Sequence, residues 1–251
     1  MRPHESLLID QDDGIITLSL SRPERRNAID RELAGALCAA VAKHGAARAI
    51  VLRSAEAGMF CAGADLGVPD EERAEVSREL YALYAQMINA SAPIVAALDG
   101  PAVGGGAQLA VACDLRVAGP AASIRFLGPG HGLAVGAWAL PSLVGRGRAL
   151  DLCLTGRTVG GDEALQIGLV DRLADDASAG AAELAAGLAT LEPDAVARVK
   201  AVAARALAGG AAAALELEAE GNARWRGGTP GLRRPRSGEP GAHDGGSVPG
   251  Q

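Results

Sequence analysis

Apolar residues along the chain form short continuous runs that alternate with amphipathic segments. Residues 15–20 (IITLSL) and 49–52 (AIVL) are short, apolar and rich in β-branched residues, which is typical of buried strands. Between these runs, Leu33 and Leu37 recur at helical spacing after Asp30, a residue type that often caps a helix. The order strand, helix, strand predicts a layered α/β domain.

The same alternation continues through the middle of the chain. Residues 69–89 are charged and amphipathic, which predicts a helix that Pro93 separates from the next element. Residues 94–98 (IVAAL) predict another buried strand, residues 107–113 a compact apolar helix, and residues 114–118 a further strand.

From Ala149 onward Ala-rich helical patterns predominate. The sequence therefore divides into an α/β region (1–148), a mostly helical region (149–226) and a tail (227–251). The tail is rich in Gly, Pro, Arg and Ser and has few large apolar residues. Because such a segment cannot bury enough surface to order itself, we expect it to be disordered.

Composition and charge narrow the classes of function. The chain has 251 residues, of which 49% are hydrophobic and 22% charged, as in a soluble globular domain. A net charge of −6 and only 2% aromatic residues argue against a nucleic-acid surface. No apolar run has membrane-spanning length, and no signal segment is visible. The four cysteines are scattered without CxxC spacing, so we expect a reduced, cytoplasmic protein without a structural metal.

Two turns of small residues carry the candidate chemistry. Residues 62–66 (AGADL) and 99–109 (DGPAVGGGAQL) each follow an extended segment and precede a helix. Two helix N-termini facing each other could offer two N–H donors to one oxygen, an oxyanion hole suited to a thioester carbonyl. The glycines are also compatible with tight helix–strand packing alone. A dinucleotide site is not expected, because Leu109 stands where the third glycine of that motif belongs.

The order of five motifs resembles the crotonase (enoyl-CoA hydratase/isomerase) superfamily. They are residues 22–28 (RPERRNA), 60–66 (FCAGADL), 104–110 with 113–115 (GGGAQLA and CDL), 154–156 (LTG) and 164–170 (ALQIGLV). The resemblance covers about residues 5–225. It implies a spiral of ββα units over residues 1–148 and a C-terminal helical region, assembled as a homotrimer or hexamer. It also implies an acyl-CoA or enoyl-CoA ligand, with coenzyme A as part of the substrate and no separate cofactor.

The resemblance assigns roles to residues by motif position. The backbone N–H groups of Ala64 and Gly105 would hold the thioester oxygen. Arg25 and Arg26 would lie near the CoA phosphates, although solvated loop charges are an equal alternative. The other residues that the resemblance places against the ligand are Ala28, Ala62, Gly63, Asp65, Leu66, Gly104, Gly128 and Trp138.

The chain departs from the family at both acid/base positions. Hydratases of the family use two glutamates, because adding water requires titratable groups. Gln108 occupies the first position, one helical turn after Gly105 and on the same face. An amide can form hydrogen bonds there but cannot act as a base. Gly128 occupies the second position, so the sequence argues against classical two-glutamate hydration.

Three hypotheses about activity follow. The short Gly-Leu-Ala loop at residues 132–134 and Trp138 resemble a branch of the superfamily that also has Gln at the first position and whose members are regarded as acyl-CoA binders. The chain could thus be an acyl-CoA-binding protein, a non-catalytic fatty acyl-CoA carrier, or an active hydratase, isomerase or decarboxylase with a different acid/base. His131 is the candidate acid/base, with an ordinary loop histidine as the alternative. Trp138 could line an acyl pocket or belong to the core.

Overall fold

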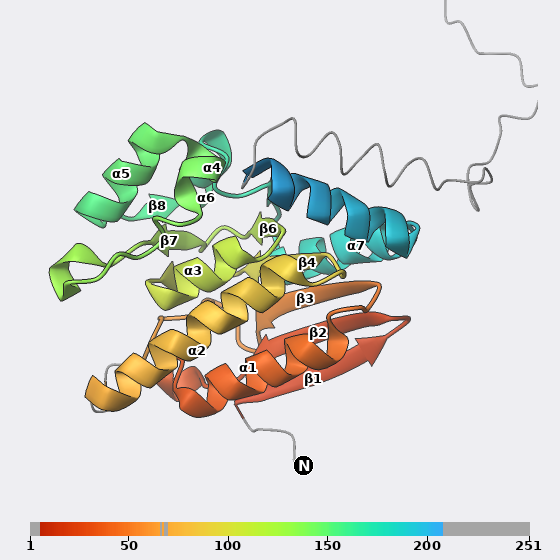
Figure 1. Cartoon of the computed structure of the whole chain (residues 1–251), viewed down its shortest axis with the longest axis horizontal. Coiled ribbons are helices and arrows are strands. Elements are labelled where there is room, and N and C mark those ends of the chain that lie inside the picture. The colour runs from red at the N-terminus through yellow and green to blue at the C-terminus, as the bar shows by residue number, and fades with distance from the viewer. Residues whose placement is uncertain (1–5, 66, 68–69, 208–251) are drawn as a thin grey trace, which may run out of the picture.

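The computed structural model describes residues 6–65, 67 and 70–207 (Figure 1). Leu66, the predicted tail and the predicted helical region beyond residue 207 lie outside the described residues. The strands are β1 (Leu7–Asp12), β2 (Ile15–Leu20), β3 (Ala49–Ser54), β4 (Ile94–Leu98), β5 (Pro101–Val103), β6 (Leu115–Ala118), β7 (Ser123–Arg125), β8 (Val159–Gly160) and β9 (Arg172–Leu173). The helices are η1 (Pro23–Arg25), α1 (Arg31–His44), α2 (Asp70–Asn89), α3 (Gly105–Ala112), η2 (Pro129–His131), α4 (Leu140–Val144), α5 (Arg146–Thr155), α6 (Gly161–Gln166) and α7 (Ala177–Ala189). Residues 193–207 are also helical.

The main sheet has six strands in the order β1-β2-β3-β4-β6-β9. Only β1 and β2 pair antiparallel, and every later neighbour pairs parallel. The β1–β2 hairpin turns at Asp13 and Gly14, whose φ angles of 44° and 79° are those of a tight hairpin turn. The α/β class predicted from the sequence is confirmed, and the first helix begins as predicted, because Asp30 Oδ1 accepts the Leu33 N–H at 2.9 Å.

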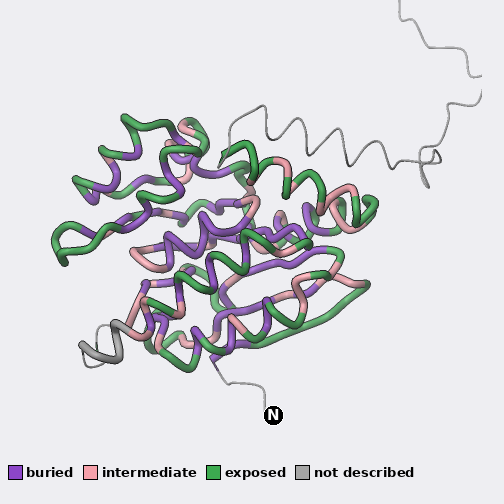
Figure 2. Tube along the Cα trace, viewed as in Figure 1, coloured by how far each residue is buried: buried purple, intermediate pink, exposed green. Residues whose placement is uncertain are grey.

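Helices cover both faces of this sheet, which explains why its strands read as continuous apolar runs. On one face, α1, α2 and α3 pack on alternate strand residues such as Ile50, Leu52 and Ile94. On the other face, α7 packs on the residues between them, which include Val51 and Val95. Figure 2 shows the inner strands as buried and the outward faces of the surrounding helices as exposed.

A second, three-stranded sheet has the order β5-β7-β8. Strand β5 pairs parallel with β7, and β7 pairs antiparallel with β8. Because β5 leads through Gly104 directly into α3, this small sheet positions the N-terminus of that helix. The four strands predicted from the sequence, β2, β3, β4 and β6, all belong to the main sheet, whereas β1, β9 and the three strands of the second sheet were missed.

The C-terminal half contributes to both sheets as well as supplying helices. Its short strands β8 and β9 join the second and the main sheet respectively. The sequence pattern from Ala149 was interpreted as mostly helical, and two-residue strands are too short to show a periodicity. Within the described part of the chain, no helix combines the length and the apolar character needed to cross a membrane.

Candidate functional site

The two small-residue turns lie side by side because the segments before them pair in parallel. An isolated bridge joins Cys61 to Ala102. The Cys61 N–H donates to the Pro101 carbonyl at 3.1 Å, and the Val103 N–H donates to the Cys61 carbonyl at 2.9 Å. In parallel pairing, equal steps along both chains reach neighbouring positions. Ala64 and Gly105 each lie three residues beyond the bridge, so the pairing brings them together.

The backbone amides of Ala64 and Gly105 have no partner among the described residues. The neighbours of Ala64 pair with Ile29, since the Ile29 N–H donates to Gly63 O at 2.7 Å and the Asp65 N–H donates to Ile29 O at 2.9 Å. The N–H of Ala64 therefore points away from that bridge. Gly105 is the first residue of α3, where an N–H has no acceptor within the helix.

The glycines of these turns also satisfy a packing requirement. A Cβ on Gly106 would lie 2.3 Å from the Cys61 carbonyl oxygen, and a Cβ on Gly63 would lie 2.6 Å from the Val103 oxygen. Gly63 and Gly104 have φ angles of 92° and 56°, which glycine adopts without strain. The two turns therefore combine tight packing with backbone amides that have no partner among the described residues.

The loop that contains the two predicted CoA-binding arginines is held against the first turn. The Ala62 N–H donates to the Arg26 carbonyl at 3.0 Å. Arg25 and Arg26 are exposed, and a Cβ on Gly67 would lie 3.8 Å from Arg25 Nη1. Ala28 is buried beneath the loop. The side chains of Arg25 and Arg26 are thus exposed on a loop that lies beside the first turn.

Sequence reasoning assigned no role to Arg22 and Asn27, which organise this loop. Arg22 Nη1 donates to the Ala28 carbonyl, and Arg22 Nη2 lies 2.9 Å from Asp30 Oδ2. The buried Asn27 Nδ2 donates to Ser54 Oγ and to the Phe60 carbonyl, each at 2.9 Å. Both residues belong to the RPERRNA motif, but the partners of Asn27 lie 27 and 33 residues away, and no periodicity marks the contacts of Arg22 with Ala28 and Asp30.

Asp65 has structural partners. Its Oδ1 accepts the Gly67 N–H at 2.8 Å, and its Oδ2 lies 3.6 Å from Arg22 Nη2. The carboxylate therefore stabilises the end of the first turn.

Gln108 is buried and already engaged through its carbonyl oxygen. Its Oε1 accepts the Gly136 N–H at 3.0 Å and the Trp138 Nε1–H at 2.9 Å. Only 5% of its surface is exposed. The side chain therefore ties α3 to the loop of residues 134–138.

An aromatic cluster lies beside the second turn. Trp138 stacks on Tyr84 with ring centroids 5.9 Å apart, and Tyr84 meets Tyr81 edge-on at 5.7 Å. The Tyr84 hydroxyl donates to the Gly105 carbonyl at 2.9 Å. Trp138 is 40% exposed, so part of its ring remains accessible. The sequence singled out Trp138 but gave neither tyrosine a role at the site.

Gly128 and His131 belong to the turn that follows β7. Gly128 is buried, and a Cβ there would lie 2.6 Å from the Leu133 oxygen and 2.9 Å from the Val135 nitrogen. The second glutamate position thus has no room for a side chain. His131 is exposed at the end of η2, where its N–H donates to the Gly128 carbonyl at 2.8 Å.

The cysteines near the turns are poor nucleophiles. Burial raises the pKa of the Cys61 thiol to about 12, and burial likewise raises the pKa of Cys113 to about 12. Both are therefore thiols at neutral pH and are buried in the core. Among the described residues, no three His, Cys, Asp or Glu side chains form a group that could hold a metal ion.

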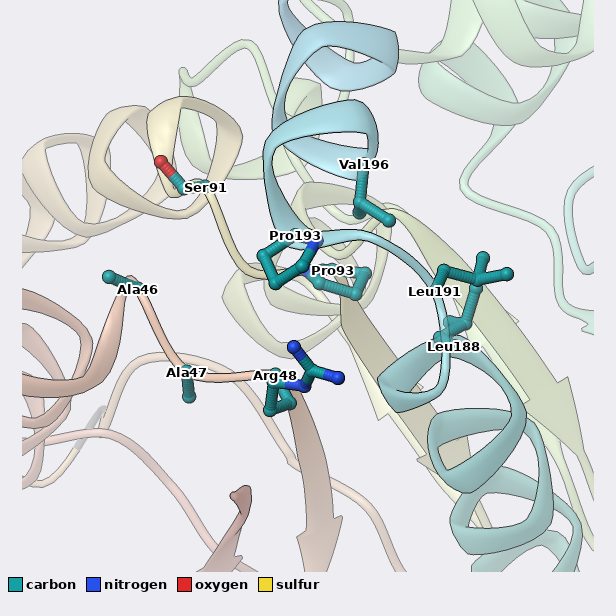
Figure 3. Close-up of a pocket in the computed structure, with 9 residues that line it drawn as sticks. All are labelled: Ala46, Ala47, Arg48, Ser91, Pro93, Leu188, Leu191, Pro193 and Val196. Carbon is teal, nitrogen blue, oxygen red and sulfur yellow. The ribbon is translucent and has the colours of Figure 1, made fainter. Parts of the chain in front are cut away.

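Two concavities lie away from the paired turns. A cavity of about 30 Å³ lies where the C-terminal helices join the sheet, and Figure 3 shows Arg48, Pro93 and Pro193 among its lining residues. Arg48 Nε donates to the Ala189 carbonyl at 2.9 Å, which caps the end of α7. A groove of about 500 Å³ beside β6 and β9 is lined in part by Gly119 and Asp175.

Comparison with known proteins establishes the family. Residues 10–223 match the enoyl-CoA hydratase/isomerase family, and the chain belongs to it. The protein named "Probable enoyl-CoA hydratase echA6" of Mycobacterium tuberculosis is 42% identical over 184 residues, which are 70% of this chain and 75% of that protein.

Solved structures of the same class share the fold. Enoyl-CoA hydratase from Bacillus anthracis superposes with a TM-score of 0.82 at 27% identity, covering 87% of this chain and 90% of the other. The enoyl-CoA hydratase from Thermoplasma volcanium gives a TM-score of 0.80 at 28% identity, covering 87% and 91%. The crotonase-type fold expected from the motifs is therefore confirmed.

Proposed function

We propose that this chain binds acyl-CoA or enoyl-CoA thioesters and holds the thioester oxygen between the N–H groups of Ala64 and Gly105. The observation that carries the proposal is the pairing of two free backbone amides on adjacent turns. Two convergent donors stabilise negative charge on a carbonyl oxygen. The amide of Gly105 has the added advantage of the positive end of α3.

The proposed site extends toward Arg25 and Arg26 for the CoA phosphates. Both guanidinium groups are exposed and lie on the loop that pairs with the first turn. Charge-assisted hydrogen bonds from arginine suit phosphate geometry. Ala62, Gly63 and the turn that follows them would then border the remainder of the CoA.

Binding without classical hydration is the activity that we propose. Gln108 cannot accept a proton at neutral pH, and Gly128 has no space for a glutamate. Two groups that transfer protons to and from water are therefore absent from the positions where the family's hydratases use them. A carrier or binding protein requires only the amides and the acyl-chain wall, for which Trp138 is our candidate.

The proposal can be tested by changing the ligand instead of the protein. We would measure affinities by isothermal titration calorimetry for hexadecanoyl-CoA, for its thioether analogue S-hexadecyl-CoA and for CoA alone. The thioether lacks only the carbonyl oxygen. We expect it to bind about tenfold more weakly than the thioester, which is the size of one or two lost hydrogen bonds. Equal affinities would exclude the two-amide site.

A second experiment decides whether the protein only binds thioesters or also converts them. Native mass spectrometry of the protein with a panel of short- to long-chain enoyl-CoA and acyl-CoA esters should show stoichiometric complexes and unchanged esters after hours. Addition of water, loss of a carboxyl group or release of free CoA would show an enzyme. The search for its acid/base would then start at His131 and Gln108.

A further inference from the structure

The oxygen and nitrogen of the Gln108 amide are distinguished by their neighbours. Both groups that approach Oε1, the Gly136 N–H at 3.0 Å and the Trp138 indole N–H at 2.9 Å, are donors and have no lone pair to offer. Rotating the amide by 180° would place an NH₂ group against two N–H groups. The acceptor therefore faces the loop of residues 134–138.

These hydrogen bonds close a ring of contacts around the second turn. Gln108 bonds to Trp138, Trp138 stacks on Tyr84 at 5.9 Å, and the Tyr84 hydroxyl donates to the Gly105 carbonyl at 2.9 Å. Gly105 and Gln108 belong to the same helix, α3, and are separated by three residues. This closed set of contacts thus links α2, α3 and the loop of residues 134–138 at the candidate oxygen-binding amide.

Two other side chains donate hydrogen bonds to carbonyls of this loop: the Cys153 thiol donates to Val135 at 3.3 Å, and Tyr81 donates to Ala134. The Tyr81 contact is also 3.3 Å long and is made from an exposed side chain. Gly136 is a tight point, because its φ is 83° and a Cβ there would lie 2.5 Å from Phe126 Cδ1. A hydrogen-bond acceptor at position 108 is therefore the central connection between α3 and this loop.

We propose that Gln108 is a positioning residue that, through Oε1, fixes the loop of residues 134–138 and holds the Trp138 ring as the wall of the acyl site beside Gly105. The effect on ligand affinity rests on the function proposed above, whereas the effect on the loop does not. A carboxylate oxygen would accept the same two hydrogen bonds. Either glutamine or glutamate at position 108 can therefore hold the loop, and this structural role does not require proton transfer.

Two substitutions test whether the hydrogen-bond acceptor at position 108 is required. Gln108→Met keeps the length and removes the acceptor, whereas Gln108→Glu keeps the acceptor. Both would be made in a Trp225→Phe background, so that Trp138 is the only tryptophan. The readouts are acrylamide quenching of Trp138 fluorescence, hydrogen exchange of the Gly136 amide, and affinities for hexadecanoyl-CoA and for CoA alone.

We expect Gln108→Met to increase Trp138 quenching about twofold, to speed Gly136 exchange at least tenfold and to weaken hexadecanoyl-CoA binding about tenfold. Affinity for CoA alone should not change, because the loop contacts the acyl chain. Gln108→Glu should retain the quenching and the exchange rate of the parent. The proposal is overturned if Gln108→Met leaves both loop readouts unchanged, or if Gln108→Glu loosens the loop equally.

Two further measurements keep the proposal testable if Gln108→Met does not fold or if the parent binds no thioester. If Gln108→Met does not fold, Trp138→Phe removes the indole N–H donor and part of the ring area while keeping an aromatic side chain, and it should weaken hexadecanoyl-CoA binding while Gly136 stays protected. An unchanged affinity in Trp138→Phe would overturn the proposed role of the ring. If the parent binds no thioester at all, the proposed function fails, and Gly136 exchange with Trp138 quenching still decides the positioning role.

Discussion

At the scale of single residues, Gln108 differs from glutamate only in its terminal group, which is an amide in place of a carboxylate. We expect a glutamate to fit the same surroundings. A carboxylate at this position would receive the Gly136 and Trp138 N–H groups. Burial raises the pKa of a carboxyl group and hydrogen bonds to its charged form lower it, and with two N–H donors we expect a glutamate here to be ionised at neutral pH. It would lie one helical turn from the candidate oxygen-binding amide of Gly105.

We therefore predict that Gln108→Glu acquires part of the family's chemistry. An ionised base beside a stabilised enolate should exchange the C2 protons of hexadecanoyl-CoA with D₂O at least tenfold faster than the parent. Addition of water to enoyl-CoA should remain absent, because Gly128 provides no second acid. Proton NMR of the ester in D₂O measures both. Normal binding by Gln108→Glu without exchange would contradict the prediction, and Gln108→Met is the inert control.

Gly128 supports a second prediction at this scale. Gly128→Ala should lower the free energy of unfolding by about 1–3 kcal/mol, the usual effect of overpacking, because its Cβ would lie 2.6 Å from the Leu133 oxygen. Gly130→Ala is the matched control, since no atom lies within 4 Å of a Cβ at that position. Chemical denaturation of both variants checks the difference. Equal stabilities would show that the turn adjusts without cost.

The sequence predicted some of these residues and not others for a physical reason. Ala64 and Gly105 were expected to act together because the family resemblance assigns both by motif position, and the structure places their turns side by side. Arg22, Asn27 and Tyr84 were missed, since most of their partners come from other turns, strands or helices and are not marked by any local sequence pattern. Only tertiary structure decides which carbonyl a hydroxyl or an amide reaches.

At the scale of helices and strands, Lys200 of the helix at residues 193–207 bonds to the segments that lead into β4 and β6. Lys200 Nζ donates to the Ala92 carbonyl at 2.7 Å and lies 2.6 Å from Asp114 Oδ2. The same carboxylate oxygen accepts the Ile94 N–H at 2.7 Å, at the start of β4. Burial raises the pKa of Asp114 above its ordinary value, although Lys200 acts in the opposite direction.

Because of this arrangement, we expect the loss of stability on removing Lys200 to depend on pH. Because the folded-state pKa of Asp114 is raised, the native state binds the proton more tightly than the unfolded state does. Stability therefore falls as pH rises from the ordinary carboxyl pKa through the folded one. Without Lys200 that pKa rises further and the pH window widens upward.

Lys200→Met should therefore lower the free energy of unfolding by about 2 kcal/mol at pH 7, between the values for exposed and fully buried pairs. The loss should be smaller at pH 4, where Asp114 is more often protonated in the variant. Melting curves from pH 4 to 8 measure it. Lys43→Met, which changes an exposed lysine on α1, is the control. A loss that is independent of pH would contradict the assigned role of Asp114.

The order of the longer elements could be predicted from periodicity, whereas the short strands could not. Strands β2, β3, β4 and β6 are rich in apolar residues, and the predicted helix of residues 69–89 corresponds to α2. Strand β1 was missed because five of its six residues are exposed, although Asp13 and Gly14 carry a hairpin signal. Strands β8 and β9 have two residues each and exist only because a sheet edge lies beside them.

At the scale of the whole molecule, helix α5 leaves apolar side chains on the surface. Leu150 and Leu154 lie one helical turn apart and are 40% and 66% exposed. Apolar residues grouped on a surface often mark an interface. The family resemblance leads us to expect a homotrimer or a hexamer, and α5 is our candidate for part of its contact.

We therefore predict that Leu154→Asp shifts the protein toward a monomer, because a charge would have to be buried in the contact. Sedimentation velocity over a range of concentrations measures the distribution of species. Val199→Asp is the matched control, since Val199 is 69% exposed on another helix. An assembly that withstands Leu154→Asp, or that is lost in Val199→Asp alone, would place the interface elsewhere. A parent protein that is monomeric at all concentrations would remove the need for any such contact.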